Sequence, residues 1–431
     1  MTLALVVALL LFLLATGLPV AFSLGIAGSV GLMMFGGPDL LVGILSTAPG
    51  SAVGSYEFMT IPMFLLMAQF MVASRISETL FSSIATWTGR LPGGLGVATA
   101  LTGAAFGAIS GSSTAAAATL SKSSIPAMMA QGYERRFASG IVSISGTLAM
   151  LIPPSVAIIF YGLLSGASVA KLLVAGIIPG LLVVLVIVFT IWLLIWRRPS
   201  LAGQATTYTW AQKFASLKVA GPFCALFLLV TGLIYLGIAT PVESSAIGAL
   251  GALVFTVLAG KMTRTVFLQA VARTCATSAM IALIVICAQI FGFFITATGT
   301  TQSLVEAVDA AGLSPYTVLA FLVVLYLVLG CFLDQLSILI LTIPIALPLV
   351  VKLGFDPIWF GILVILLAEV GMVTPPVGLN VFIVSKSANM PVGEVFHGVL
   401  PHVVAHVALI ALMIVFPQII LWLPSTMGGG T

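Results

Sequence analysis

Charged side chains are scarce in this sequence: Lys, Arg, Asp and Glu make up 6% of its 431 residues, and hydrophobic residues make up 61%. A soluble domain carries about 25% charged residues. A soluble fold could not bury so much apolar surface, and apolar runs of about 18 or more residues recur along the chain. The composition predicts an all-α polytopic membrane protein, and the net charge of +4 gives no indication of nucleic-acid binding.

Cysteine and histidine are also rare, with four and three copies. The cysteines stand apart in apolar runs, so neither a disulfide framework nor a thiolate metal site is indicated. In HVVAH, His402 and His406 lie one helical turn apart, but the glutamate of an HExxH motif is missing. GAISG, from Gly107 to Gly111, is not the GxSxG motif of a nucleophilic serine. We therefore expect neither an enzyme nor a bound cofactor.

The start of the chain, MTLALVVALLLFLLATGLPVAFSLG, lacks a basic region and a small-residue cleavage site. A secretory signal peptide has both. We therefore expect this segment to form a first membrane span.

An internal repeat aligns the two halves of the chain at one constant offset. The offset places Pro153–Pro154 on Pro375–Pro376, and LPVAFS on TPVESS. A series of matches at one offset indicates two homologous halves. We expect a first repeat over 1–197, a linker over 198–218 and a second repeat over 219–431. The same offset also aligns Pro126 with Pro348, Gly132 with Gly354, Tyr133 with Phe355, Phe137 with Trp359 and Met150 with Met372.

Each repeat is expected to combine continuous spans, one broken stretch and one split span. A polar, amphipathic piece, SRISETLFSSIATWTGRLP, is expected along the membrane surface. In the first repeat we expect spans near 2–18, 20–36, 58–74 and 171–197, a stretch at 92–130 broken at SGSST, and a split span at 133–164. In the second, the broken stretch is 314–353, interrupted at FLDQLS, and the split span is 355–386.

The basic residues predict the orientation of the repeats. With 92–130 and 314–353 as re-entrant hairpins, each repeat crosses the membrane five times, and an odd number inverts the second repeat. With the N-terminus outside, twelve Lys and Arg fall at cytoplasmic ends and only Lys171 and Lys352 fall outside. The segments expected in the cytoplasm are 75–90, 133–136 and 197–218; those expected outside are 38–57, 165–170 and the C-terminus.

The two proline pairs interrupt apolar spans at their centres. Proline costs roughly 3 kcal/mol in a helix interior, because it lacks the N–H and clashes with the preceding turn. The freed backbone groups cannot face lipid, and they are tolerated only inside protein or beside a wet cavity. In inverted repeats the hairpin tips and proline breaks would meet near the midplane, which is the layout of a secondary transporter.

The expected hairpin tips carry oxygen ligands. SGSST offers hydroxyls and free amides suited to Na⁺ or a carboxylate, although a small-residue packing seam would explain the same residues. Asp334, which aligns with Ser112, either helps to bind a cation or caps the following half-helix. Glu369 is either near the site or paired within the bundle, and Asn380 either binds a ligand or hydrogen-bonds another helix.

Three segments, SGSSTAAAATLSKSSIPAMMAQGYERRFASGIVSISGTLAMLIPPSVAIIFYG, GCFLDQLSILILTIPIALPLV and EVGMVTPPVGLNVFIVS, resemble the large membrane subunit of the tripartite ATP-independent periplasmic (TRAP) transporters. This resemblance implies an elevator-type importer of organic anions, often carboxylates, driven by sodium. It implies one set of sodium ligands around Ser110, Ser112 and Ser113 with the turn before Pro153. It implies a second set around Asp334 and the turn before Pro375. The candidate binding residues are Ser110, Gly111, Ser112, Ser113, Thr114, Gly146, Thr147, Pro153, Pro154, Asp334, Gly371, Thr374, Pro375, Pro376 and Asn380.

The resemblance also implies partners: a small four-span membrane subunit and a periplasmic solute-binding protein, in the inner membrane of a bacterium. Two alternatives stay open, a stand-alone sodium-coupled symporter and an intramembrane hydrolase that uses Ser110 or the paired histidines. Sodium-driven uptake would distinguish both transporters from the hydrolase. No arginine lies at either tip to indicate a carboxylate clamp.

Overall fold

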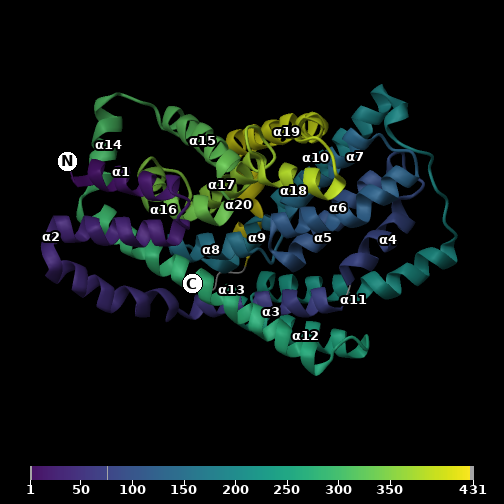
Figure 1. Cartoon of the computed structure of the whole chain (residues 1–431), viewed down its shortest axis with the longest axis horizontal. Helices are drawn as coiled ribbons and strands as arrows, with labels where there is room; N and C mark the ends of the chain where they lie inside the picture. The colour runs from purple at the N-terminus through teal and green to yellow at the C-terminus, as the bar shows by residue number, and fades with distance from the viewer. Residues whose placement is uncertain (1, 75, 428–431) are drawn as a thin grey trace.

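The structure is a computed structural model that describes residues 2–74 and 76–427, without the side chains of 76–78, 108–110, 219 and 309. Within this part the chain is helical and contains no β-strand, as the composition predicts (Figure 1). The first half contains α1 (Thr2–Ala15), α2 (Val20–Val53), α3 (Thr60–Ala73), α4 (Ile76–Thr88), α5 (Gly94–Ser110), α6 (Ser113–Ala130), α7 (Arg135–Thr147), α8 (Val156–Ser165), α9 (Val169–Ala175) and α10 (Ile177–Arg197).

Short 3₁₀ turns, Tyr56–Met59, Leu148–Met150 and Pro199–Leu201, join some of these helices. The second half contains α11 (Trp210–Tyr235), α12 (Pro241–Leu258), α13 (Arg264–Ala297), α14 (Thr300–Ala310), α15 (Pro315–Phe332), α16 (Gln335–Lys352), α17 (Pro357–Gly371), α18 (Leu379–Ala388), α19 (Val392–Val415) and α20 (Gln418–Ser425).

Eight helices in the described part are long and apolar enough to cross a membrane, and the bent helix α11 would make nine. Pro222 lies near the bend in α11, which is consistent with the missing N–H and the ring clash of a proline inside a helix. The number of membrane crossings does not follow from helix length alone. Helices α7 and α8, and likewise α17 and α18, are shorter pieces on either side of a break. The chain is therefore a multi-pass membrane protein.

The helices pack in two groups. In the first, α2 packs along α13 and α3 packs against both α12 and α13. In the second, α7 contacts α5, α6 and α19, while α17 contacts α15 and α16. Figure 1 shows α3, α11, α12 and α13 along the lower side of the molecule, with α5 to α7, α15 and α17 to α19 above them.

Small residues allow these helices to approach closely, as is common between helices in membranes. A Cβ atom added to Gly28 of α2 would lie 2.8 Å from Phe291 Cα of α13. A Cβ atom on Gly140 of α7 would lie 2.2 Å from the carbonyl carbon of Gly398 in α19. Each of these two helix–helix contacts therefore requires a glycine at its closest point.

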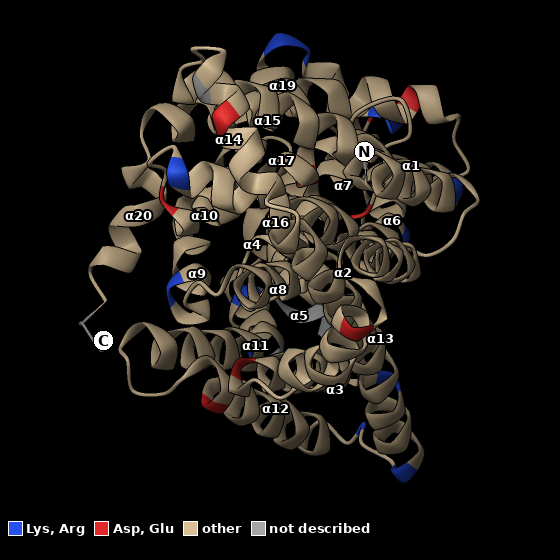
Figure 2. Cartoon of the chain, turned by 90° about the vertical axis from the view of Figure 1, so that its left-hand side faces the viewer, with Lys and Arg blue, Asp and Glu red and all other residues tan. Residues whose placement is uncertain are grey.

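Lys, Arg, Asp and Glu are few and lie mostly toward the margins of the molecule, whereas its middle is formed by uncharged residues (Figure 2). Glu369, which is 1% exposed, is the exception that bears on the site.

Two expected loops are helical instead. The expected outer loop 38–57 is helical up to Val53, because Gly37 takes a left-handed φ of 76° and Pro38 starts a new helical segment after it. The expected linker 198–218 is helical from Trp210, because Thr209 and Gln212 form a reciprocal capping box. The polarity of 198–218 and the place of 38–57 between expected spans predicted loops, and local start signals for helices override both.

The expected interruptions are confirmed. The stretch 92–130 divides into α5 and α6 at Gly111–Ser112, and 314–353 divides into α15 and α16 at Leu333–Asp334. Both proline pairs lie in non-helical segments, one between α7 and α8 and one between α17 and α18.

Candidate functional site

The first helix break is a tight turn with a capped helix after it. Gly111 has a φ of 57°, which favours glycine, and Ser112 is the N-cap of α6. The Ser112 hydroxyl accepts a hydrogen bond from the Ala115 amide at 3.4 Å and lies 3.1 Å from Thr114 Oγ1. A Cβ atom on Gly111 would lie 2.7 Å from Val156 Cγ2, so this turn sits against the start of α8. The side chain of Ser110 lies outside the described residues.

The second break uses an acidic cap at the equivalent position. Asp334 is the N-cap of α16: its Oδ2 accepts from the Ser337 amide at 3.3 Å, and its Oδ1 accepts from the Ser337 hydroxyl. The next residue, Gln335, is buried and donates from Nε2 to the Ile365 carbonyl oxygen of α17 at 3.2 Å. The capping alternative for Asp334 is thus seen, and cation binding stays a prediction.

One carbonyl group released by each proline pair finds a new donor. Pro154 cannot donate to the Met150 carbonyl oxygen, and the Ser155 hydroxyl donates to it instead. Pro376 cannot donate to the Met372 carbonyl oxygen. The backbone N–H of Asn380 donates to it instead, at 3.1 Å. Each break is therefore closed by a group that follows it in the chain.

A second backbone hydrogen bond joins the break at Pro375–Pro376 to α15. The Gly378 amide donates to the Cys331 carbonyl oxygen at 3.2 Å, so the segment after Pro376 lies against the last turn of α15.

One hydrogen bond joins the first tip to the second proline break. The Ser113 hydroxyl donates to Asn380 Oδ1 at 3.1 Å, and it lies 3.7 Å from Met372 Sδ. Ser113 and Asn380 are 1% and 0% exposed. Helix α6 packs against α18, so the first tip meets the broken span of the other half, and α16 packs against α8. The structure thus brings together residues that the sequence places 267 positions apart.

The remaining candidate residues have visible structural roles. Thr147 and Thr374 donate their hydroxyls to carbonyl oxygens of their own helices, those of Ile144 and Val370. Gly146 packs against Ala117, and a Cβ atom on Gly371 would lie 2.4 Å from Gly330 Cα. Ligand binding by these residues stays a prediction.

The two proline breaks differ in accessibility. Pro153 and Pro154 are buried, whereas Pro375, Pro376 and Asp334 are exposed. The second proline break therefore offers more open surface than the first, while Ser112 and Thr114 at the first tip are partly exposed.

Buried polar atoms near the second break are unpaired within the described residues. They include Gln335 Oε1, Asn380 Nδ2 and both carboxylate oxygens of Glu369. The expected alternative that Glu369 pairs within the bundle is thus not seen in this part of the chain. Gln335 was not among the residues predicted from the sequence, although the offset between the repeats places it on Ser113.

The histidines of HVVAH are buried, and three of their four ring nitrogens have no hydrogen-bond partner among the described residues. His402 and His406 are buried on α19, and His406 Nδ1 lies 2.8 Å from the His402 carbonyl oxygen. Among the described residues, no group of three or more His, Cys, Asp or Glu is arranged to hold a metal ion.

A polar cavity of about 520 Å³ is lined by residues that are far in the sequence from both hairpin tips. Its volume falls in the range of roughly 300–1,000 Å³ for small-molecule sites. It lies among α2, α8, α12 and α13, and none of the candidate residues lines it. The polar side chains that line it are Ser51, Ser55, Tyr56, Glu57, Thr60, Ser168, Thr240 and Gln289.

We predict that Ser113→Ala and Asn380→Ala are coupled in stability. The bond between them is buried, and a typical hydrogen bond contributes about 0.5–1.5 kcal/mol. The double variant should therefore lose less stability than the sum of the single variants, by about that amount. Thermal unfolding of the four proteins in detergent measures the coupling. Additive losses would contradict the bond, and Thr102→Ala, whose hydroxyl bonds only within α5, serves as the uncoupled partner in a control cycle.

Residues 7–419 match the family described as "Tripartite ATP-independent periplasmic transporter, DctM component". The C4-dicarboxylate TRAP transporter large permease protein DctM of Rhodobacter capsulatus is 31% identical over 437 residues, which cover 97% of this chain and 98% of that protein. The isethionate TRAP transporter permease protein DctMQ of Oleidesulfovibrio alaskensis is 32% identical over 417 residues, which cover 96% of this chain and 64% of that longer protein.

The crystal structure of the Alcanivorax borkumensis YdaH transporter has a similar fold, with a TM-score of 0.66 and 16% sequence identity. The match covers 89% of this chain and 90% of that one. At this identity the likeness concerns the fold alone. The match over nearly the whole length, with the two permease relatives, shows that this chain belongs to the DctM-component family of tripartite ATP-independent periplasmic transporters, and is a transport permease and not an enzyme.

Proposed function

We propose that this chain is the large permease subunit of a sodium-coupled secondary transporter that imports a small organic acid. The observation that carries the proposal is the buried bond between Ser113 at the first tip and Asn380 after the second proline break. Broken helices that meet inside a membrane protein are the usual place for substrate and coupling ion in secondary transporters.

The helix bounds support two repeats. Helix α6 begins at Ser113 and α16 at Gln335, and α7 begins at Arg135 and α17 at Pro357. Both pairs have the same separation as Pro153 and Pro375, and so do the N-caps Ser112 and Asp334. We take the repeats as inverted, because twelve of the basic residues then fall on the cytoplasmic side.

Sodium is the coupling ion that the tip chemistry favours. Hard cations bind carboxylate, hydroxyl and carbonyl oxygens. Asp334 supplies an exposed carboxylate, and Ser112 and Ser113 supply hydroxyls at the equivalent break. In an elevator mechanism, the second group of helices would carry the ion and solute past the first group.

An organic acid is supported by the relatives, one of which is named for C4-dicarboxylates and another for isethionate. Both names denote small anions. The polar cavity of about 520 Å³ offers hydroxyl and amide groups and the Glu57 carboxylate, but no Lys or Arg among the residues that line it. Anion binding in this cavity would then depend on its amide and hydroxyl donors, against the repulsion of the Glu57 carboxylate.

The family description implies partners for this component: a small membrane subunit and a periplasmic solute-binding protein. We place the complex in the bacterial inner membrane, with both termini of this chain in the periplasm. The segment between α8 and α9, which borders the polar cavity, would face the binding protein.

Uptake by reconstituted protein tests the proposal. The chain would be placed in vesicles with and without its two partners, and an inward sodium gradient would be imposed. We expect concentrative uptake of a radiolabelled C4-dicarboxylate or isethionate only with sodium and both partners. Concentrative uptake by the chain alone would support a stand-alone symporter, and uptake that is indifferent to sodium would reject the coupling.

Asp334→Asn separates the two roles of this residue. Asparagine caps helices about as well as aspartate, so the unfolding temperature should change little. Loss of the charge should raise the half-saturating sodium concentration of transport roughly ten- to hundredfold.

The matched control is Asp356→Asn, at the N-cap of α17, where Asp356 accepts from the amides of Ile358 and Trp359. Its sodium dependence should match the unmodified protein. An unchanged sodium dependence in Asp334→Asn would assign Asp334 to capping alone.

A further inference from the structure

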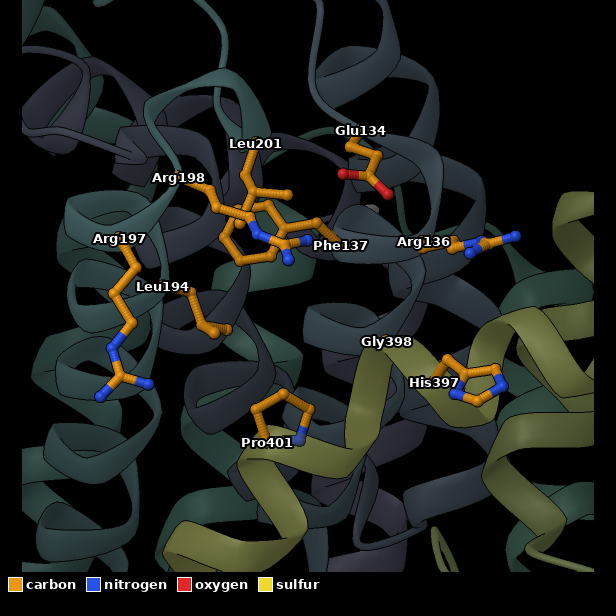
Figure 3. A pocket seen from close by; sticks show the side chains of 10 residues that line it. All are labelled: Glu134, Arg136, Phe137, Leu194, Arg197, Arg198, Leu201, His397, Gly398 and Pro401. Atoms are coloured by element: carbon orange, nitrogen blue, oxygen red, sulfur yellow. The ribbon is translucent and has the colours of Figure 1, made fainter.

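A second cavity, of about 470 Å³, lies between the start of α7, the end of α10 and the start of α19. Three arginines line it, Arg136, Arg197 and Arg198, together with one acidic residue, Glu134. Figure 3 shows Arg198 lying over Phe137 near the centre of the cavity, with Leu194 and Pro401 below. None of the candidate transport residues lines this cavity.

The arginines do not contribute equally. Arg136 forms an ion pair with Glu394 at 3.5 Å, and in Figure 3 its side chain extends away from Arg198. The Glu134 amide donates to the Leu201 carbonyl oxygen at 3.0 Å, which holds the turn after α10 against the start of α7. Arg197 and Arg198 are exposed and have no ion pair within the described residues. They are therefore the cations available to an anionic ligand.

The cavity lies at the level of a membrane surface. Arg197 ends the apolar span Val169–Arg197, whose length exceeds the roughly 20 residues that a bilayer requires. Trp192 and Trp196, on the last turns of the same span, are 43% and 80% exposed. Tryptophan is enriched at the interface between lipid and water, so these side chains mark the depth of the headgroups.

An exposed apolar face of α19 continues from the cavity toward the middle of the span. Residues three and four apart share one face of a helix. From His397 and Pro401 in the cavity wall this spacing leads to Val404, Ala408 and Leu412, and all three are exposed. A ligand with an anionic head and an acyl chain would match both the arginines and this face.

We propose that this cavity binds the phosphate headgroup of an anionic phospholipid, with an acyl chain along α19. The proposal needs only that the cavity opens at a membrane surface, and it does not depend on sodium coupling or on the substrate. Basic pockets between membrane helices are a known kind of site for such headgroups.

Thermal unfolding of the purified chain in detergent tests the site. Long-chain phosphatidylglycerol should raise the unfolding temperature saturably, whereas phosphatidylcholine with the same chains should not. Arg197→Gln combined with Arg198→Gln should weaken the apparent affinity for phosphatidylglycerol roughly ten- to thirtyfold. Arg264→Gln, at an exposed arginine that does not line the cavity, is the matched control and should leave the affinity unchanged.

Three outcomes would overturn the proposal. Equal affinity in the double glutamine variant and the unmodified chain would remove the arginines from the site. Equal stabilisation by inorganic phosphate or six-carbon phosphatidylglycerol would assign the cavity to a soluble anion. If the double variant does not fold, Arg197→Lys combined with Arg198→Lys keeps the charge and should retain phosphatidylglycerol binding; its loss with folding intact would reject a headgroup held by charge.

Discussion

Backbone N–H and C=O groups cannot be left without partners in hydrocarbon, and this constraint governs the arrangement of the chain around its two proline breaks. Each proline pair removes two donors from a helix, and each break recovers partners locally, through Ser155 in one case and the amide of Asn380 in the other. Such a break is tolerated only where protein or a wet cavity surrounds it. The first proline break is accordingly buried inside the second group of helices, and α6 and α16 each pack against a piece of the broken span from the opposite half.

The same burial brings polar chemistry to the interior of an apolar protein. Gln335, Glu369 and Asn380 keep buried polar atoms unpaired within the described residues, which is costly unless a ligand, an ion or water satisfies them. Polar groups of this kind inside a membrane protein usually have a function. Gly330 and Gly371 let α15 and α17 approach closely near these polar groups. The close helix packing and the buried polar groups therefore lie in the same region.

Much of this was predictable from the sequence, because proline pairs, SGSST and FLDQLS are local signals with local causes. The helix breaks fall where those residues stand, and Asp334 caps α16 as one of its two expected roles requires. The helices within 38–57 and 198–218 were not predicted, and they start at Gly37–Pro38 and at the Thr209–Gln212 box. The hydrogen-bond partner of Ser113 could not be predicted from the sequence either. Its bond to Asn380 depends on how α6 packs on α18, and no local pattern encodes that.

Inversion of the repeats is the central claim, and labelling at equivalent positions tests it most directly. Leu91 and Leu313 are each 38% exposed and occupy equivalent positions of the two repeats, in the loops before α5 and α15. Single cysteines would replace them in a chain without its four native cysteines, of which Cys224 and Cys275 are exposed. With a membrane-impermeant maleimide on intact spheroplasts, Leu313→Cys should be labelled and Leu91→Cys should react only after permeabilisation. Labelling of both from the same side would contradict inverted repeats.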